Sequence, residues 1–347
     1  MKTILQTVAK EDPNKDAILH AADIIRRGGL VAFPTETVYG LGADGTRADA
    51  ATAIFAAKGR PADNPLILHI AEPSDAEKYA YTSPLFYALA KAFMPGPLTV
   101  VLSAKEIVPL SVRASLPTVA VRCPIHPIAQ ALIRESGVAI AAPSANLSGS
   151  PSPTCGEHVF QDLNGRIDMI LDGGECAIGL ESTIVKLLDD HSMLLLRPGA
   201  ITKEQLENIG EVLVADAVTG AIKEGQVVES PGMKYRHYAP KSPLKLIKGT
   251  EKARQKYILG QINNQICILC YHHELELYSR YIDTKYLFDL GNLGDTATHC
   301  QRLFKLLREA DLTNISHIYA PLPEPEGIGL ALYNRMIRAA AYCIIEV

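Results

Sequence analysis

The sequence predicts an α/β protein with two domains, the first built on a mixed sheet with helices packed against it. The chain has 347 residues, enough for two ordinary domains. Helix and strand patterns alternate irregularly along the first two hundred residues, and several strands follow one another without a helix, which favours a mixed sheet over an alternating parallel one. Around residues 205–240 the sequence becomes polar and weakly patterned, as in a linker.

Apolar spacing predicts the elements of the first domain. Between Asp16 and Arg27 apolar residues recur at helical spacing, and Gly28-Gly29 ends this helix before a strand at residues 30–33. The same reasoning predicts helices at 48–57, 85–93 and 128–135, and strands at 66–70, 98–103, 119–122 and 138–142.

The remaining residues predict a small α/β domain. Strands are expected at 244–247, 266–271 and 315–320, with a helix at 295–308. We therefore divide the chain into a catalytic domain at 1–208, a linker at 209–240 and a small domain at 241–347. Cys267 and Cys270 form a CxxC pair, but the apolar residues around them indicate a buried strand, and no second cysteine pair lies at zinc-site spacing. No metal-binding residues are predicted.

Composition excludes several classes of function. The formal net charge is −4, which argues against extensive binding of a phosphate backbone by the whole surface. The chain is 48% apolar and 21% charged, as in soluble globular proteins, and has no membrane-spanning run. The N-terminus lacks a secretory pattern, so we expect a cytoplasmic protein whose seven cysteines are reduced.

The segment from Lys58 to His69 indicates an anion site. Lys58 and Arg60 precede Pro61-Ala62-Asp63-Asn64-Pro65, and two prolines so close together exclude a helix interior. The two cations therefore lie on a loop that runs into a strand, an arrangement that commonly presents charged groups to ligands. The alternative is a solvated turn with two surface cations.

Residues 34–45 contain two patterns. Gly40-Leu41-Gly42-Ala43-Asp44-Gly45 matches GxGxxG, but the polar run before it separates the glycines from the strand, and Asp44-Gly45 is typical of a turn, so we reject a dinucleotide site. The run Thr35-Glu36-Thr37 is more informative, because two hydroxyls flanking a carboxylate suit a small zwitterion. An ordinary strand edge rich in threonine is the alternative.

Other strand ends carry polar groups. Ser144, Asn146 and Ser148 follow the strand at 138–142 in a turn suited to phosphate oxygens, or simply in a turn. Ser182 precedes another apolar run, and Arg122 and Arg197 each close a strand. A single arginine in such a place is usually a surface residue, so these positions matter only together.

The end of the linker concentrates cations and aromatic residues. Residues 230–240 read Ser-Pro-Gly-Met-Lys-Tyr-Arg-His-Tyr-Ala-Pro, a composition suited to phosphate contacts and adenine stacking, or to a linker packed on one domain. No Walker A sequence and no G-x-S-x-G turn occurs, so ATP would bind through another loop.

Together these segments resemble the threonylcarbamoyl-AMP synthase family in its long form, in which a YrdC-like domain is joined to a smaller Rossmann-like domain. The resemblance covers essentially the whole chain and rests on residues 33–42, Lys58-x-Arg60, Ser144-x-Asn146 and the linker at 230–240. It implies a YrdC-like mixed twisted sheet with a concave site. It also implies a nucleotidyltransferase that converts ATP, L-threonine and bicarbonate or carbon dioxide into threonylcarbamoyl-AMP and pyrophosphate. A separate transferase then modifies the adenosine beside the tRNA anticodon.

The resemblance also suggests roles for individual residues. Lys58, Arg60 and Arg197 would hold the triphosphate, and Ser144 and Asn146 would bind phosphate oxygens. Thr35, His69, Arg122 and Ser182 would hold threonine, with Arg122 paired to its carboxylate. The remaining nucleotide-site candidates are Thr118, Ser152, Tyr235 and His237. Mg²⁺ is expected on the phosphates and not in a protein cage.

Two other functions are compatible with a basic concavity. One is a binding module for double-stranded RNA or the ribosome, against which the acidic net charge argues. The other is a hydrolase of carbamoyl phosphate or an acyl adenylate, which would not need threonine. Under the synthase hypothesis, direct tRNA binding is weak or absent.

Overall fold

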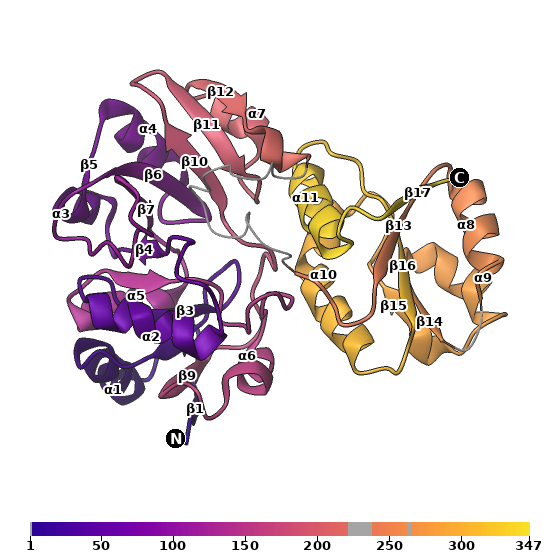
Figure 1. Cartoon of the computed structure of the whole chain (residues 1–347), viewed down its shortest axis with the longest axis horizontal. Helices are drawn as coiled ribbons and strands as arrows, with labels where there is room; N and C mark the ends of the chain where they lie inside the picture. Colours follow the sequence, from indigo (N-terminus) through magenta and orange to yellow (C-terminus); the bar gives the residue numbers. More distant parts are fainter. Residues whose placement is uncertain (1, 221–237, 263–264) are drawn as a thin grey trace. The chain divides into compact units, whose positions relative to one another are not determined.

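The structure is a computed structural model that describes residues 2–220, 238–262 and 265–347. The chain divides into two compact units, a large one of residues 1–148 and 152–234 and a small one of residues 149–151 and 235–347. Each unit has its own sheet with helices packed against it (Figure 1).

The described part of the large unit forms a mixed, 12-stranded sheet. Parallel and antiparallel pairs are interspersed across it, as the sequence predicted. In sheet order the strands are β1 (Ile4–Thr7), β9 (Met169–Asp172), β2 (Val31–Phe33), β3 (Gly40–Asp44), β8 (Ile140–Ala142), β4 (Ile67–His69), β7 (Thr118–Arg122), β6 (Leu98–Ala104), β10 (Thr183–Leu187), β11 (Ser192–Arg197) and β12 (Glu211–Val214), with β5 (Ala80–Tyr81) paired to β6.

Capping residues in the sequence mark several helix ends of the large unit. The side chain of Asn14 accepts a hydrogen bond from the Ala17 N–H at the start of α1, and Gly59 ends α2 in the left-handed conformation with φ of 60°. Helices α1 and α5 pack side by side and share a hydrophobic core with β2, β8 and β9 (Figure 1). The helices are α1 (Lys15–Arg26), α2 (Ala48–Lys58), α3 (Ala76–Tyr79), α4 (Pro84–Phe93), α5 (Pro127–Ser136), α6 (Gly156–Leu163) and α7 (Lys203–Glu207).

The glycines of the GxGxxG pattern lie inside a strand. Gly40 and Gly42 belong to β3, antiparallel to β2, whereas the sequence predicted no strand here. A Cβ atom on Gly42 would come within 2.8 Å of the Phe33 ring, and one on Gly40 within 3.2 Å. These glycines therefore make room for an aromatic ring on the sheet, and they do not form a phosphate-binding turn between a strand and a helix.

The small unit is a parallel α/β layer structure. Its described strands form the order β15 (Leu287–Asp289), β14 (Ile266–Cys270), β16 (His317–Pro321), β13 (Leu244–Lys248) and β17 (Ile344–Glu346), and each neighbouring pair is parallel. Helices α10 (Thr296–Asp311) and α11 (Gly329–Ala339) pack together on one face of the sheet, and α8 (Glu251–Leu259) and α9 (Leu275–Ser279) lie on the other (Figure 1). Short 3₁₀ turns at His272–Glu274 and Thr284–Tyr286 complete the unit.

Residues near the expected domain boundary extend the large sheet. Residues 211–214, assigned above to the start of a linker, form β12 and pair with β11. Most of the rest of that linker, residues 221–237, lies outside the described residues, so the boundary at 208 remains a prediction.

Two further sequence features can be checked in the structure. Cys267 and Cys270 are buried in β14, as the apolar pattern predicted, and all seven cysteines are free. Among the described residues, no helix has both the length and the apolar character needed to cross a bilayer.

Candidate active site

The loop between β2 and β3, residues 34–39, connects most of the predicted site segments. Tyr39 pairs with the 143–146 turn, because its carbonyl accepts a hydrogen bond from the Ala145 N–H at 2.8 Å. Its own N–H donates to the Pro153 carbonyl at 2.9 Å. On the other side, the N–H groups of Ile178 and Gly179 donate to the carbonyls of Glu36 and Thr37. We call residues 34–39 the central loop.

Lys58, Ser144 and Asn146 form one cluster beside the central loop. Lys58 is the last residue of α2, and its Nζ donates to the carbonyls of Ser144 at 2.5 Å and Asn146 at 2.6 Å. The Ser144 hydroxyl donates to Asn146 Oδ1 at 2.5 Å, and a β-bridge joins Ser144 to Gly40. The structure therefore brings together the two halves of the Lys58-x-Arg60 and Ser144-x-Asn146 signature.

Arg60 stabilises the loop that follows α2. Its guanidinium donates to the carbonyls of Asn64 at 3.0 Å and Pro65 at 3.4 Å, and it lies over the Phe55 ring. Lys58 and Arg60 are only 3% and 9% exposed. A solvated turn with two surface cations is therefore not what the chain forms.

Two candidate threonine-binding residues, His69 and Arg122, lie on neighbouring strands, and Ser182 directly precedes β10. Arg122 is opposite His69 in the β4–β7 pair and opposite Thr99 in the β6–β7 pair. Thr99 in turn shares a hydrogen bond of 2.7 Å with Ser182, and Arg197 donates to the carbonyl and the hydroxyl of Ser182 at 3.0 and 3.1 Å. Both strand-end arginines are buried, so neither is the surface residue that such a position usually holds.

Arg122 also connects this group to the central loop. Its Nη2 donates to Glu36 Oε1 at 2.6 Å, and both side chains are less than a tenth exposed. Next to Glu36, the Thr35 hydroxyl donates to the Val38 carbonyl and lies 2.8 Å from the Thr37 hydroxyl. Thr35, Arg122, His69, Ser182 and Arg197 thus belong to one connected set.

Thr118 and Ser152 lie at the margins of this connected set of residues. Because Ile67 is opposite Ala120, the register places Thr118, at the start of β7, level with the end of the Arg60 loop. Ser152 is buried and donates to the Glu181 carboxylate, next to Ser182. Tyr235 and His237 lie outside the described residues.

Comparisons with known proteins identify the family. Residues 23–199 match the family model described as Telomere recombination, and residues 201–341 match the one described as Threonylcarbamoyl-AMP synthase, C-terminal domain. The chain is 44% identical over 337 residues to a threonylcarbamoyl-AMP synthase of Bacillus subtilis (strain 168), over 96% of this chain and 95% of the relative. The chain belongs to the threonylcarbamoyl-AMP synthase family.

Other threonylcarbamoyl-AMP synthases and solved structures agree with this assignment. The Pyrococcus abyssi (strain GE5 / Orsay) relative is 46% identical over 94% of this chain and 95% of its own length. The crystal structure of P. abyssi Sua5 complexed with L-threonine matches with a TM-score of 0.91 and 42% identity, over 99% of this chain and 100% of that chain. The resemblance and the fold class inferred from sequence are therefore confirmed.

Residues outside the sequence-based set also lie at the candidate site. Glu36 and Glu181 each bond a predicted residue, and the buried Asn64 side chain has no hydrogen-bond partner among the described residues. Glu36 lies inside the Thr35-Thr37 run, so its position was visible in the sequence. Its pairing with Arg122, 86 positions away, was not.

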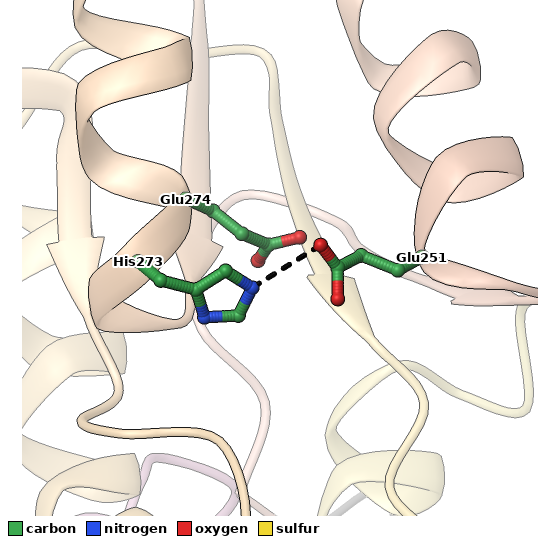
Figure 2. A group of neighbouring side chains, drawn as sticks. All are labelled: Glu251, His273 and Glu274. Atoms are coloured by element: carbon green, nitrogen blue, oxygen red, sulfur yellow. Dashed lines mark ion pairs between the residues drawn. The ribbon is translucent and has the colours of Figure 1, made fainter.

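A group in the small unit offers metal-ligating atoms. Glu251, His273 and Glu274 place one ligand atom each within 4.8 Å of one another (Figure 2). Gln255 donates to both carboxylates, and Arg254 lies 3.6 Å from Glu274. These contacts account for the group as an ion-pair and hydrogen-bond network, so we assign no metal to this part of the synthase.

The buried histidine of the site should make the synthase sensitive to acid. Burial lowers the pKa of His69 to about 3, and the charge of Arg122 acts in the same direction. Between that value and the ordinary pKa near 6.5, the unfolded chain binds a proton here and the folded chain does not. The free energy of unfolding therefore falls with decreasing pH, by about 1.4 kcal/mol per unit from this residue.

Urea unfolding at pH 7 and pH 5 tests this expectation. The change His69→Asn should reduce the loss of stability between the two pH values by about 2 kcal/mol. The change His191→Asn, at an exposed histidine, is the control and should leave that loss unchanged. An equal loss in the wild type and in His69→Asn would show that the folded chain protonates His69 as readily as the unfolded chain does.

Proposed function

We propose that the protein is an L-threonylcarbamoyladenylate synthase that makes threonylcarbamoyl-AMP and pyrophosphate from ATP, L-threonine and bicarbonate or carbon dioxide. One structural observation is the main support for this proposal. The buried cations Lys58, Arg122 and Arg197 all belong to the bonded set around the central loop. The full-length similarity to threonylcarbamoyl-AMP synthases, one of them crystallised with L-threonine, supports the same reaction.

The proposed reaction needs no protein nucleophile. The threonine amine and the carboxylate formed on it supply the attacking groups, so the protein must bind, orient and neutralise charge. We assign Lys58, Arg60 and Arg197 to the triphosphate, with Ser144 and Asn146 on phosphate oxygens. Thr118 and Ser152 are assigned to the nucleotide side.

The other subsite would hold threonine. We assign Thr35, His69, Arg122 and Ser182 to it, with Arg122 on the carboxylate. The double hydrogen bond from Arg197 to Ser182 connects the proposed phosphate and amino-acid subsites directly. Subsites joined in this way would hold the carbamate of threonine close to the α-phosphorus of ATP. Attack of the carbamate oxygen on that phosphorus then releases pyrophosphate.

Mg²⁺ would enter with ATP. Among the described residues, the group of side chains that could hold a metal ion by itself lies in the small unit, and the proposed phosphate subsite is built from cations, hydroxyls and amides. These groups fit a metal bound through the phosphates, where it neutralises their charge.

Pyrophosphate release tests the proposed function. The full-length protein with ATP and Mg²⁺ should release pyrophosphate only when both L-threonine and bicarbonate are present, and threonylcarbamoyl-AMP should accumulate in equal amount. Release without threonine would indicate a hydrolase. No release, together with RNA affinity that falls steeply with salt, would favour the RNA-binding alternative.

We further propose that Tyr235 and His237 bind ATP and help to exclude water from the labile intermediates. Changing both to alanine should lower the yield of threonylcarbamoyl-AMP per pyrophosphate released, because adenylate or carbamate is lost to hydrolysis. Quantifying both products in one reaction gives this ratio. The change Tyr281→Ala, at an exposed tyrosine of the small unit, should leave the ratio unchanged, and an unchanged ratio in the double variant would contradict this role.

The product requires a partner. Threonylcarbamoyl-AMP would pass to a separate transferase that modifies tRNA in the cytoplasm. With a net charge of −4, this chain would bind tRNA weakly or not at all.

A further inference from the structure

The Glu36 carboxylate is buried and only half satisfied. Its residue is 7% exposed, and Oε1 accepts the 2.6 Å hydrogen bond from Arg122. Its Oε2 is also buried but has no hydrogen-bond partner among the described residues. A buried carboxylate oxygen without a donor is costly, and such a group calls for a partner that a ligand or water can supply.

Hydrogen bonds hold the backbone on both sides of this carboxylate. The Glu36 carbonyl accepts from the Ile178 N–H at 2.9 Å, and the next carbonyl, that of Thr37, accepts from the Gly179 N–H at 3.0 Å. On the other side of Glu36, the Thr35 hydroxyl bonds within the central loop. Glu36 therefore presents a positioned acceptor, unlike a mobile carboxylate on the surface.

The pair of Glu36 and Arg122 matches an α-amino acid in charge. A zwitterion brings a carboxylate and an ammonium group, and the pair offers one cation and one anion at 2.6 Å. A ligand carboxylate on Arg122 and a ligand ammonium on Glu36 would leave each of these four charges with an opposite neighbour. A ligand with a neutral group in place of the ammonium would leave its own carboxylate and that of Glu36 to share the single positive charge of Arg122.

We propose that Glu36 is a substrate-binding residue that selects for the amino group. Its Oε1 holds Arg122, and its Oε2 accepts a hydrogen bond from the nitrogen of L-threonine. This inference rests on the proposed function, because it takes L-threonine as the ligand. It predicts that the site discriminates against 2,3-dihydroxybutanoate, which keeps the carboxylate and the side-chain hydroxyl but has a hydroxyl in place of the amine.

Calorimetric titration of the full-length protein tests the inference. The wild type should bind L-threonine at least about 100-fold more tightly than 2,3-dihydroxybutanoate, because a neutral hydroxyl cannot balance the buried charge of Glu36 as an ammonium does. The change Glu36→Gln should weaken L-threonine binding by about 30-fold or more, leave dihydroxybutanoate binding within about 3-fold, and leave ATP binding unchanged. The matched control is Glu72→Gln, which removes a carboxylate from an exposed ion pair with Arg134 and should change none of these affinities.

Each outcome has a distinct meaning. Equal losses for both ligands in Glu36→Gln would show that Glu36 acts only through Arg122, and the inference would be wrong. Equal affinity of the wild type for both ligands would also overturn it, whether or not the variant folds. If the wild type binds no L-threonine and makes no threonylcarbamoyl-AMP, the proposed function itself fails, which the pyrophosphate assay detects separately.

Discussion

Changing Lys58 to methionine should lower kcat/KM for ATP by at least about 100-fold, the cost of losing one positioned group that stabilises charge in a transition state. Lys58 is 3% exposed, and its ammonium is held by the carbonyls of Ser144 and Asn146. In the proposed reaction this charge stands where negative charge grows on the phosphates. Methionine fills a similar volume but supplies neither the charge nor the hydrogen bonds.

Stability must be measured alongside activity, because Lys58 is also a structural connection. Its removal leaves two carbonyls without this donor, at a cost of about 1–3 kcal/mol each. Urea unfolding at 25 °C measures that cost, and pyrophosphate release measures kcat/KM under conditions where the variant is folded. The control is Lys91→Met, at an exposed position on α4. A folded Lys58→Met variant with kcat/KM within about 3-fold of the wild type would restrict Lys58 to a structural role.

Local sequence signals were sufficient for most elements of the fold. The helix predicted at 128–135 is α5 (Pro127–Ser136), and it ends at Gly137 in the left-handed conformation. The strand predicted at 98–103 is β6 (Leu98–Ala104). In each case apolar spacing and the residues at the ends act within one segment, so the local pattern carries the information.

Strand β3 was missed because its sequence, Gly-Leu-Gly-Ala-Asp, has little of the branched or aromatic character typical of strands. What makes it a strand is distant in the sequence. It pairs with β8, nearly a hundred residues away, and the Phe33 ring occupies the space above its glycines. A single-segment pattern cannot report a contact of this kind.

The candidate site also combines features that one segment predicts with features that depend on distant contacts. The sequence identified Arg122 and Arg197 as strand-end cations, but it could not show that both are buried or that Arg197 bonds Ser182. The carboxylate that pairs with Arg122 comes from a loop 86 residues earlier. Residue types at strand ends can thus be read locally, whereas charge compensation depends on the order of strands in the sheet.

Changing Arg122 to lysine should raise the threonine KM by roughly 10- to 100-fold and the ATP KM by less than about 3-fold. Arg122 donates from Nη2 to Glu36, and its Nε lies 3.5 Å from the Gly96 carbonyl. The planar guanidinium has further N–H groups for a ligand carboxylate. A lysine has one nitrogen on a longer flexible stem, so it cannot hold Glu36 and a carboxylate in the same fixed arrangement.

Steady-state kinetics with each substrate varied in turn measures the two KM values. Arg134→Lys is the matched control, because Arg134 pairs with Glu72 in an exposed ion pair whose contribution is small. A general disturbance of the buried site would raise both KM values alike. A selective rise in the threonine KM, in contrast, is expected if Arg122 serves the threonine subsite, through its own contact with the carboxylate and through its hydrogen bond to Glu36, while Arg60, Lys58 and Arg197 bind the nucleotide. Equal increases would therefore assign Arg122 to the stability of the site as a whole and not to the threonine subsite.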